Sequence, residues 1–298
     1  MKLSYTILDV FTTTCYAGNP LAIVRVPHQL RAALTQSQKQ GIAKEFNLSE
    51  TVFLHEDADT GKGEVIVDVF TPEAEIPFAG HPSIGTIYHL IRQKSQPVKT
   101  LLMKAGPLSI SVDNDAGLVG AEIPHNVHIH GTKLASDLSI YRECPLVSIV
   151  KGMNFILVHL SDLVALHKAN QSLKRHPYQP EGLDQGWSQG FTGTYFYVPL
   201  GVDSRGRQTF RTRMLSTESE EDPATGSAAS ALTAYLALQE SLEKGAGPFE
   251  YVLTQGVEMG RTSHIFVSIQ RKPNGDGIET VTLRGTAVGV MEGTLEVD

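Results

Sequence analysis

The sequence predicts an α+β fold in two related lobes, and three observations support this expectation. Segments rich in β-branched and aromatic residues recur along the chain with turn residues between them. Helical stretches are few and do not alternate strictly with these segments, which favours α+β over a regular strand-helix alternation. A unit of strand, acidic turn, glycine and helix occurs twice. The length of 298 residues also suffices for two domains.

The expected strands lie between turn residues and are rich in valine, isoleucine, threonine and aromatic residues. They are residues 4–11, 21–26, 52–54, 65–70, 108–112, 118–123, 147–150, 155–159, 195–199, 209–215, 252–254, 265–269 and 280–284. Helices are expected at residues 30–46, 83–93, 162–174 and 229–242. Asn47 is typical of a helix C-terminus, and Ser161 is the predicted N-cap of the third helix.

The repeated unit indicates an internal duplication. A strand at residues 65–70 and another at 209–215 each lead through an acidic turn to a glycine and a helix. Superposing the two glycines gives these pairs: Ala79 with Thr225, Gly80 with Gly226, and His81 with Ser227. A chance match of a common pattern is the alternative for so short a segment. A true duplication would allow two helix N-termini to face each other across a cleft between the lobes.

The balance of charges argues against a nucleic-acid partner. Lys and Arg number 25 against 32 Asp and Glu, a net charge of −7, and division at residue 128 shares it as −3 and −4. Neither part carries the basic surface that phosphate backbones require. No apolar run is long enough for a membrane span or a signal peptide. The two cysteines, Cys15 and Cys144, exclude a disulfide scaffold and fit a reducing compartment, so we expect a cytoplasmic protein.

Two predicted helix N-termini offer binding sites for a carboxylate. Gly80 and Gly226 stand where the backbone N–H groups of a first turn and the positive end of the helix dipole can meet a ligand. His81 and Ser227 follow them with side chains that can hydrogen-bond, and Asp222 lies just upstream of the second glycine. The alternative is that Asp222 and Ser227 are simple helix caps.

Glu50 is the candidate general acid/base. It follows the helix expected at residues 30–46 and stands just before the strand expected at residues 52–54. A carboxylate at such a corner can be half buried, which raises its pKa toward the range that proton transfer at neutral pH needs. Taken alone, this motif is equally compatible with a surface glutamate after a loop.

Six separated motifs together give a more specific indication. They are G-N-P-L-A-I-V at 18–24, E-F-N-L-S-E-T at 45–51, F-T-P at 70–72, P-F-A-G-H-P at 77–82, D-P-A-T-G-S-A at 222–228 and G-T-A-V at 285–288. In this order they resemble the PhzF-like family, the phenazine-biosynthesis isomerases and their relatives. The resemblance implies the diaminopimelate-epimerase-like fold, in which two pseudo-symmetric lobes each wrap a sheet around a central helix, with the active site between them. We expect an N-terminal lobe at 1–128 and a C-terminal lobe at 129–298, and leave open a return of the last strand to the first lobe.

The resemblance also implies roles for the candidate residues. In the family's isomerase, a glutamate moves a proton between two carbons of trans-2,3-dihydro-3-hydroxyanthranilate, and Glu50 matches it. The other residues carried over are His81 and Asp222 as catalytic groups, and Gly80, Gly226 and Ser227 as substrate-binding groups. A single carboxylate over one face of a ring can remove and return a proton without a metal or an organic cofactor, provided that the site excludes water.

The implied function is therefore a cofactor-independent proton shift on a small carboxylated metabolite, cyclic or derived from an amino acid. The alternative is a non-catalytic protein of the same fold that binds a small molecule or another protein, although a pure binder has no need of a general base. The family and exposed sheet edges both suggest a homodimer. Related racemases use two cysteines just before the helix-terminal glycines, where this chain has Ala79 and Thr225, so a two-thiol mechanism is excluded.

Three other motifs are weighed and set aside. Residues 186–190 match the G-x-S-x-G nucleophile elbow but stand before a strand-like segment instead of between a strand and a helix. His125, His128 and His130 are spaced closely enough to suggest a metal, but no acid or thiolate nearby in the sequence completes a ligand set, so we expect solvated histidines and no metal. Walker A and strand-linked G-x-G-x-x-G motifs are absent, which gives no support to a nucleotide cofactor.

Overall fold

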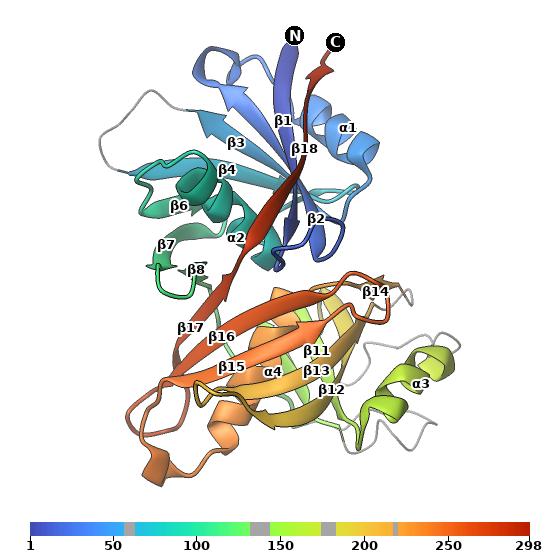
Figure 1. Cartoon of the computed structure of the whole chain (residues 1–298), viewed down its shortest axis with the longest axis vertical. Coiled ribbons are helices and arrows are strands. Elements are labelled where there is room, and N and C mark those ends of the chain that lie inside the picture. The colour runs from blue at the N-terminus through green and yellow to red at the C-terminus, as the bar shows by residue number, and fades with distance from the viewer. Residues whose placement is uncertain (57–62, 132–143, 174–182, 217–219) are drawn as a thin grey trace. The chain divides into compact units, whose positions relative to one another are not determined.

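The computed structural model describes residues 1–56, 63–131, 144–173, 183–216 and 220–298. These form two units, Met1–Glu122 with Arg284–Asp298, and Ile123–Leu283 (Figure 1). The expected lobes, 1–128 and 129–298, differ from this division at both ends of the second lobe. The C-terminal segment belongs to the first unit because its strand β18 (Ala287–Glu296) pairs antiparallel with β1 (Lys2–Val10).

A mixed sheet forms most of the first unit. Besides β18 and β1, its strands are β2 (Asn19–Pro27), β3 (Thr51–Glu56), β4 (Glu64–Phe70), β5 (Glu75–Ile76), β6 (Thr100–Met103), β7 (Gly106–Asp113) and β8 (Leu118–Glu122). The strands pair antiparallel except at two places, where β2 runs parallel to β3 and β4 runs parallel to β6. Helix α1 (Gln36–Phe46) packs on β3 and β4.

Helix α2 (Gly80–Tyr88) is the centre of the first unit. It contacts β1, β2, β3, β8 and β18, and seven of its nine residues are buried. Gly85 lets the helix approach the sheet closely, since a Cβ there would lie 2.6 Å from Cδ2 of Leu21. One π-helical turn, His89–Gln93, continues α2 to the end of the helix expected at 83–93. A helix that is buried on every face must be enclosed, so the sheet wraps around it.

The second unit has the same construction around helix α4 (Gly226–Gln239), of which ten residues are buried. Its strands are β9 (His128–Ile129), β10 (Leu146–Val150), β11 (Met153–His159), β12 (Phe191–Val202), β13 (Gln208–Leu215), β14 (Glu221–Asp222), β15 (Phe249–Gln255), β16 (Ser263–Arg271) and β17 (Ile278–Gly285). Helix α4 contacts β10, β11, β15 and β16, and helix α3 (Leu163–Leu173) packs on β12 and β13. Short 3₁₀ turns lie at His28–Leu30 in the first unit and Leu242–Lys244 in the second.

Strand pairing confirms the duplication that the sequence predicts. In the first unit, β2–β3 is parallel, β3–β4 and β4–β5 are antiparallel, β4–β6 is parallel and β6–β7 is antiparallel. The pairs β11–β12, β12–β13, β13–β14, β13–β15 and β15–β16 repeat this series in the same order. Gly80 and Gly226, superposed on sequence alone, are the first residues of the two central helices. The α+β architecture of two pseudo-symmetric lobes, each a sheet around one helix, is therefore confirmed.

The helix boundaries depart from expectation at their starts. Helix α1 begins at Gln36 and not near residue 30, because Thr35 and Gln38 form a reciprocal capping box. Its predicted end is confirmed, since Asn47 adopts the left-handed conformation with φ 50°. Helix α3 is capped by Asp162 and not by Ser161: Oδ1 of Asp162 accepts a hydrogen bond from the backbone N–H of Ala165 at 2.8 Å.

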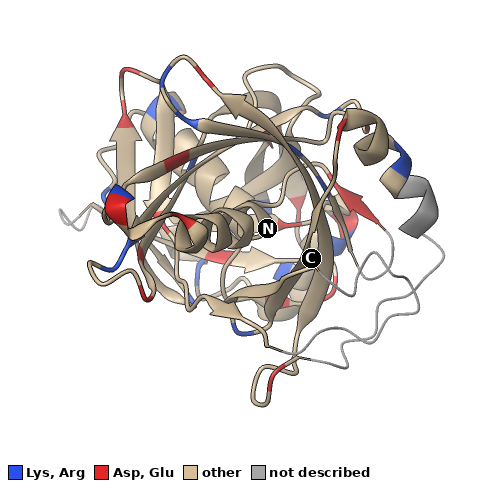
Figure 2. Ribbon diagram, turned by 90° about the horizontal axis from the view of Figure 1, so that it is seen from below, with Lys and Arg blue, Asp and Glu red and all other residues tan. Residues whose placement is uncertain are grey.

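Charged residues of both signs are interspersed on the described ribbon (Figure 2), in keeping with a charge surplus shared along the chain. No helix within the described ranges is long and apolar enough to cross a membrane. Of the two cysteines, Cys15 is exposed and Cys144 is half-buried, and both are free thiols.

A buried ionic cluster fastens α1 to the sheet of the first unit. Lys39 of α1 reaches Oδ2 of Asp68 on β4 at 2.5 Å, and Nε2 of His55 on β3 lies 2.8 Å from the same oxygen. Burial alone would raise the pKa of Asp68, but the hydrogen bonds and charges of His55 and Lys39 outweigh it and lower that pKa to about 2. The ionised carboxylate therefore stabilises the fold.

We expect Asp68→Asn to lower the free energy of unfolding at pH 7 by about 2–4 kcal/mol, because Lys39 would keep a buried charge without its counterion. Urea unfolding measures this loss. Because the pKa of Asp68 is lower in the folded state than its ordinary value of 3.8, the wild-type advantage should be complete above pH 4 and shrink as the pH falls toward 2. The control is Lys104→Gln, which breaks the pair with Glu75 at a lysine that is 61% exposed and should cost less than about 1 kcal/mol. Equal losses for both variants would contradict the interpretation.

Candidate active site

Glu50 occupies the corner between α1 and β3 in the first unit. The left-handed turn at Asn47 ends the helix, and the chain enters β3 one residue after Glu50. The Glu50 side chain is 18% exposed, and its Oε2 is buried and accepts no hydrogen bond from the described residues. The sequence-based expectation of a half-buried carboxylate matches this placement, and the alternative of an ordinary surface glutamate does not.

His81 lies beside Glu50, at the start of the central helix. Its Nδ1 is 3.4 Å from Oε2 of Glu50, and its side chain is 5% exposed. The N-cap of α2 is Ala79, in an extended conformation, and an alanine has no side-chain oxygen to accept a hydrogen bond from the first turn. The structure thus brings together a carboxyl group, an imidazole and the N-terminal end of a buried helix.

The protonation equilibrium of Glu50 is displaced toward neutrality. Burial disfavours the charged form and raises the pKa of Glu50 to about 7, against a smaller opposing effect of its hydrogen bond with Ser49. A group with such a pKa is present in both protonation states near pH 7, so it can accept a proton and return it without a large energetic penalty in either direction.

The second unit supplies an equivalent helix N-terminus with different side chains. Helix α4 begins at Gly226, and Ser227 in its first turn is 8% exposed. Its N-cap is Thr225, so the interpretation of Asp222 or Ser227 as the N-cap is wrong. The Thr225 hydroxyl donates to Oδ2 of Asp222 at 2.6 Å and makes no capping bond to the helix. Oδ1 of Asp222 accepts the backbone N–H of Ala224 at 3.3 Å.

A buried ion pair fixes the short strand that carries Asp222. Arg213 of β13 makes two hydrogen bonds of 2.7 Å to the carboxylate of Glu221, with side chains 3% and 10% exposed. Another nitrogen of Arg213 donates to the carbonyl groups of Leu166 and His167 on α3. Because Glu221 and Asp222 form β14, this pair holds the backbone next to the candidate catalytic carboxylate.

The structure places the predicted residues in two sets. Glu50, Gly80 and His81 lie together in the first unit, and Asp222, Gly226 and Ser227 lie together at the start of α4 in the second. That the two sets share one substrate stays a prediction. Sequence reasoning missed Arg213, Glu221 and Gln255, a buried glutamine bonded to the Asp222 turn. Their partners come from other strands, so no local pattern marks them.

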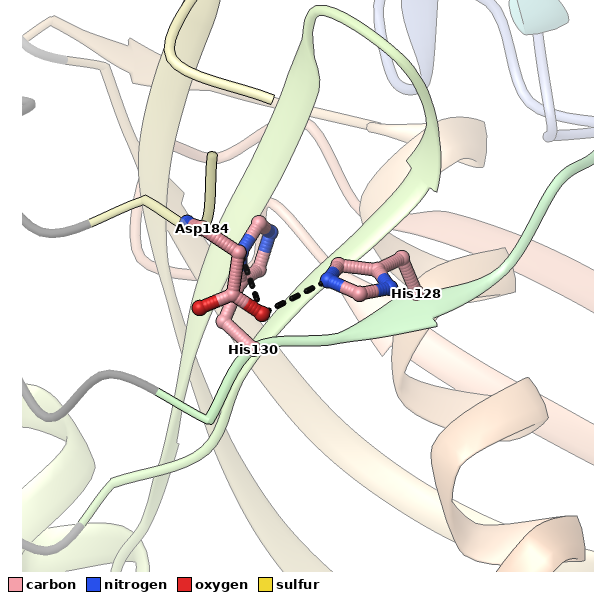
Figure 3. Close-up of side chains that lie close together, drawn as sticks. All are labelled: His128, His130 and Asp184. Carbon is pink, nitrogen blue, oxygen red and sulfur yellow. Dashed lines mark hydrogen bonds and ion pairs between the residues drawn. The ribbon is translucent and has the colours of Figure 1, made fainter. Parts of the chain in front are cut away.

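The histidine cluster of the second unit differs from the expectation of solvated side chains. Asp184, far along the chain, brings the acid that was not found near these histidines in sequence, and the ligating atoms of His128, His130 and Asp184 lie within 4.8 Å of one another (Figure 3). Nε2 of His128 is 2.8 Å from Oδ2 of Asp184, and His128 stacks on Trp187. His130 is 8% exposed.

The hydrogen bonds of His130 leave little scope for a metal in this arrangement. Its Nδ1 accepts the backbone N–H of Asp184 at 3.1 Å, and its Nε2 is 2.7 Å from the hydroxyl of Ser148, which donates to Asn154. Both ring nitrogens are therefore already engaged, and coordination would have to break one of these bonds. The cluster instead connects β9, which pairs with β10, to Asp184.

The structure also accounts for the G-x-S-x-G match. Ser188 donates to the carbonyl of Leu183 at 3.3 Å, and a strand, β12, begins one residue after Gly190. A Cβ at Gly190 would lie 2.2 Å from the carbonyl oxygen of Gly152, so close backbone packing explains this glycine. With no helix after the serine, the motif lacks the geometry of a nucleophile elbow.

Comparison with known proteins places this geometry in a family. The model of the family described as phenazine biosynthesis-like protein matches residues 8–293. A trans-2,3-dihydro-3-hydroxyanthranilate isomerase of Pseudomonas chlororaphis is 28% identical over 300 residues, covering 98% of each chain. Among solved structures, a phenazine biosynthesis protein of the PhzF family from Bacillus anthracis superposes with a TM-score of 0.73 at 23% identity, over all of both chains.

The fold extends to more distant enzymes. A hydroxyproline epimerase from Agrobacterium vitis, solved with bound trans-4-hydroxy-L-proline, superposes with a TM-score of 0.63 at 13% identity, covering 99% of this chain and 92% of the other. The epimerase-like fold expected from the motifs is thereby confirmed. The chain is an isomerase, and it belongs to the family of phenazine biosynthesis-like proteins.

Proposed function

We propose that this protein is a cofactor-independent isomerase that moves a proton between two carbons of a small carboxylated metabolite, cyclic or derived from an amino acid. The observation that carries the proposal is Glu50, a partly buried carboxyl group with a pKa of about 7 that lies 3.4 Å from His81. The name of the Pseudomonas chlororaphis relative supports a substrate similar to trans-2,3-dihydro-3-hydroxyanthranilate. The chemistry needs only an acid/base group, a binding site for a carboxylate and exclusion of water.

In the proposed mechanism, the ionised Glu50 removes a proton from one carbon of the substrate and returns it to another on the same face. One proton leaves the first carbon and one is returned to the second, after exchange with solvent while it is carried by Glu50. The shifted electron pair remains in the substrate, so the step is balanced without an oxidant or reductant. His81 is close enough to Glu50 to hold the carboxyl group in position and to exchange a proton with it. Asp222 is the second proton-transferring group.

The substrate carboxylate is assigned to the helix N-termini. Backbone N–H groups at Gly80 and Gly226 and the hydroxyl of Ser227 provide donors, and the dipoles of α2 and α4 add positive potential. Neither N-cap side chain competes for these donors, since Ala79 has no acceptor and Thr225 is directed to Asp222. This arrangement would hold the substrate while Glu50 acts on it.

A homodimer is also part of the proposal, on the ground of the exposed sheet edges. We expect light scattering at micromolar concentration to give about twice the chain mass of 32.4 kDa. A single species at the mass of one chain would contradict this expectation.

The raised pKa of Glu50 can be tested without a substrate. Its folded-state pKa of about 7 exceeds the ordinary value of 4.5, so the folded protein binds a proton that the unfolded chain releases, and stability falls as the pH rises from 4.5 to 7. Glu50→Gln removes this loss. We expect the variant to be more stable than the wild type at pH 8, by up to about 3 kcal/mol, and similar to it at pH 5.

Thermal unfolding at the two pH values measures the difference. Glu45→Gln, on the exposed part of α1, is the matched control and should not change stability in a pH-dependent way. A Glu50→Gln variant that is no more stable than the wild type at pH 8 would show that the carboxyl group is not held in an environment that opposes its charge.

The proton shift is tested with trans-2,3-dihydro-3-hydroxyanthranilate in D₂O, followed by NMR. We expect the wild type and Glu45→Gln to isomerise the compound with solvent deuterium entering the product. Glu50→Gln should reduce the rate by about 10²–10⁴-fold, since Gln cannot accept the proton. Full activity of Glu50→Gln would refute the mechanism, and no turnover by the wild type would refute the substrate class.

A further inference from the structure

Gln255, the last residue of β15, is completely buried beneath the turn that leads into α4. Its Nε2 lies 2.8 Å from the carbonyl oxygen of Asp222 and 3.0 Å from Oγ1 of Thr225. Its Oε1 lies 3.1 Å from the hydroxyl of Tyr195 and 3.4 Å from the backbone nitrogen of Thr225. We propose that Gln255 is a positioning residue, which acts through Thr225 to orient and polarise the Asp222 carboxylate. The inference rests on the proposed function of Asp222.

The partners fix the orientation of the Gln255 amide. A carbonyl oxygen can only accept, so the atom facing the carbonyl of Asp222 must be the NH₂ group. A backbone N–H can only donate, so the atom facing the N–H of Thr225 must be the amide oxygen. The hydroxyl of Tyr195 lies 3.1 Å from that oxygen and 3.0 Å from Oγ1 of Thr212, and its one hydrogen can serve either of them. The amide therefore cannot flip without losing these bonds.

The fixed amide of Gln255 determines which way the hydroxyl group of Thr225 donates. Because Nε2 of Gln255 donates to Oγ1 of Thr225, the hydroxyl hydrogen of Thr225 must point elsewhere. It points to Oδ2 of Asp222, 2.6 Å away. The result is a chain of donors that runs from Gln255 through Thr225 to Asp222. A donor to an ionised carboxylate favours the ionised form and fixes which oxygen remains for other contacts.

The first unit shows that the fold itself does not need this chain. Ile76 ends β5 as Asp222 ends β14, Ala79 is the N-cap of α2 as Thr225 is that of α4, and Met103 ends β6 as Gln255 ends β15. Met103 also lies against the start of its helix, with Sδ 3.6 Å from the hydroxyl of Ser83.

The three equivalent positions are therefore apolar in the first unit and polar in the second. They are Ile76, Ala79 and Met103 in the first unit, and the hydrogen-bonded Asp222, Thr225 and Gln255 in the second. Burying a polar group costs free energy unless every bond is satisfied, and a methionine at the same place fills the space without that cost. A purely structural role therefore does not explain why the second unit uses a glutamine there. Orientation of a carboxylate that reacts does explain it.

The test replaces each polar residue by an apolar one of similar size. Gln255→Met introduces the residue of the first unit, and Thr225→Val removes only the hydroxyl group. Thr225→Ser restores the hydroxyl, and Gln208→Met is the control, since Gln208 bonds Glu240 elsewhere in the second unit. Because two different variants break the chain of donors, a failure of one to fold leaves the other informative.

The first readout needs no substrate. Protein with ¹³C-labelled aspartate carboxyl groups is titrated by NMR, with the Asp222 signal identified by its absence in Asp222→Asn. We expect the midpoint of Asp222 to rise by about 0.5–1 pH unit in Gln255→Met and Thr225→Val, because the ionised form loses a donor, and to stay unchanged in Thr225→Ser and Gln208→Met. Equal midpoints in all variants would overturn the proposal.

The second readout is kinetic, with trans-2,3-dihydro-3-hydroxyanthranilate as the probe. We expect kcat to fall about 10- to 100-fold in Gln255→Met and Thr225→Val with little change in KM, because a misplaced carboxylate affects the reaction more than binding. If Glu50→Gln is inactive but Gln255→Met keeps the wild-type kcat and the wild-type titration midpoint of Asp222, the positioning role of Gln255 is refuted. The proposed function of the protein is then still supported. If Glu50→Gln is fully active, the proposed function fails, whatever the midpoint of Asp222.

Discussion

The complete burial of one helix in each unit is the constraint on which the rest of the structure depends. Helices α2 and α4 carry small and apolar residues on all faces, so each must be enclosed by strands before it is stable in water. The surrounding strands bury the side chains of the helix. The backbone N–H groups of its first turn still need a hydrogen-bond acceptor. Neither Ala79 nor Thr225 supplies one from its side chain. The element that forms the core thereby also presents backbone donors at its first turn, where the proposed function places the substrate carboxylate.

Two acidic side chains of the first unit show that hydrogen-bond and charge partners determine whether a shielded carboxyl group has a lowered or a raised pKa. Asp68 and Glu50 are similarly shielded from solvent, with side chains 21% and 18% exposed. Asp68 receives the ammonium group of Lys39 and the imidazole of His55, and its pKa falls. Glu50 has only the more distant His81 and the hydrogen bond with Ser49, and its pKa rises. The first arrangement strengthens the fold. The second lowers stability as the pH rises, and such a displaced pKa is typical of groups that transfer protons.

Much of the fold could be predicted from the sequence because its determinants are local. The strand pattern, the turn at Asn47 and the two helix-starting glycines follow from residue types in short segments. The start of α1 was placed too early because the capping box of Thr35 is a stronger signal than the apolar residues before it. The two-residue strands β5, β9 and β14 are too short for any periodicity and exist only because a neighbouring strand pairs with them.

The candidate site was predictable only where a motif marks it. Glu50, His81 and Asp222 were identified from motifs of a known family, but the residues that support them were not. Gln255 bonds a turn that lies far from it in sequence, and Arg213 connects β14 with α3, so their importance depends on a topology that no single segment encodes. The return of the last strand to the first lobe, left open from the sequence, likewise depends on a distant partner, since β18 pairs with β1.

That pairing has a consequence for the order in which the protein is made. The first unit cannot complete its sheet until β18, which follows the whole second unit along the chain, is available to β1. The amino group of Met1 donates to the carbonyl of Val297, next to the pairing of β1 with β18. The second unit is in effect an insertion between β8 and β18, and every strand and helix assigned wholly to it precedes the closing strand. On the ribosome, the first unit therefore starts before the second unit but can complete its sheet only after the second unit has been synthesised.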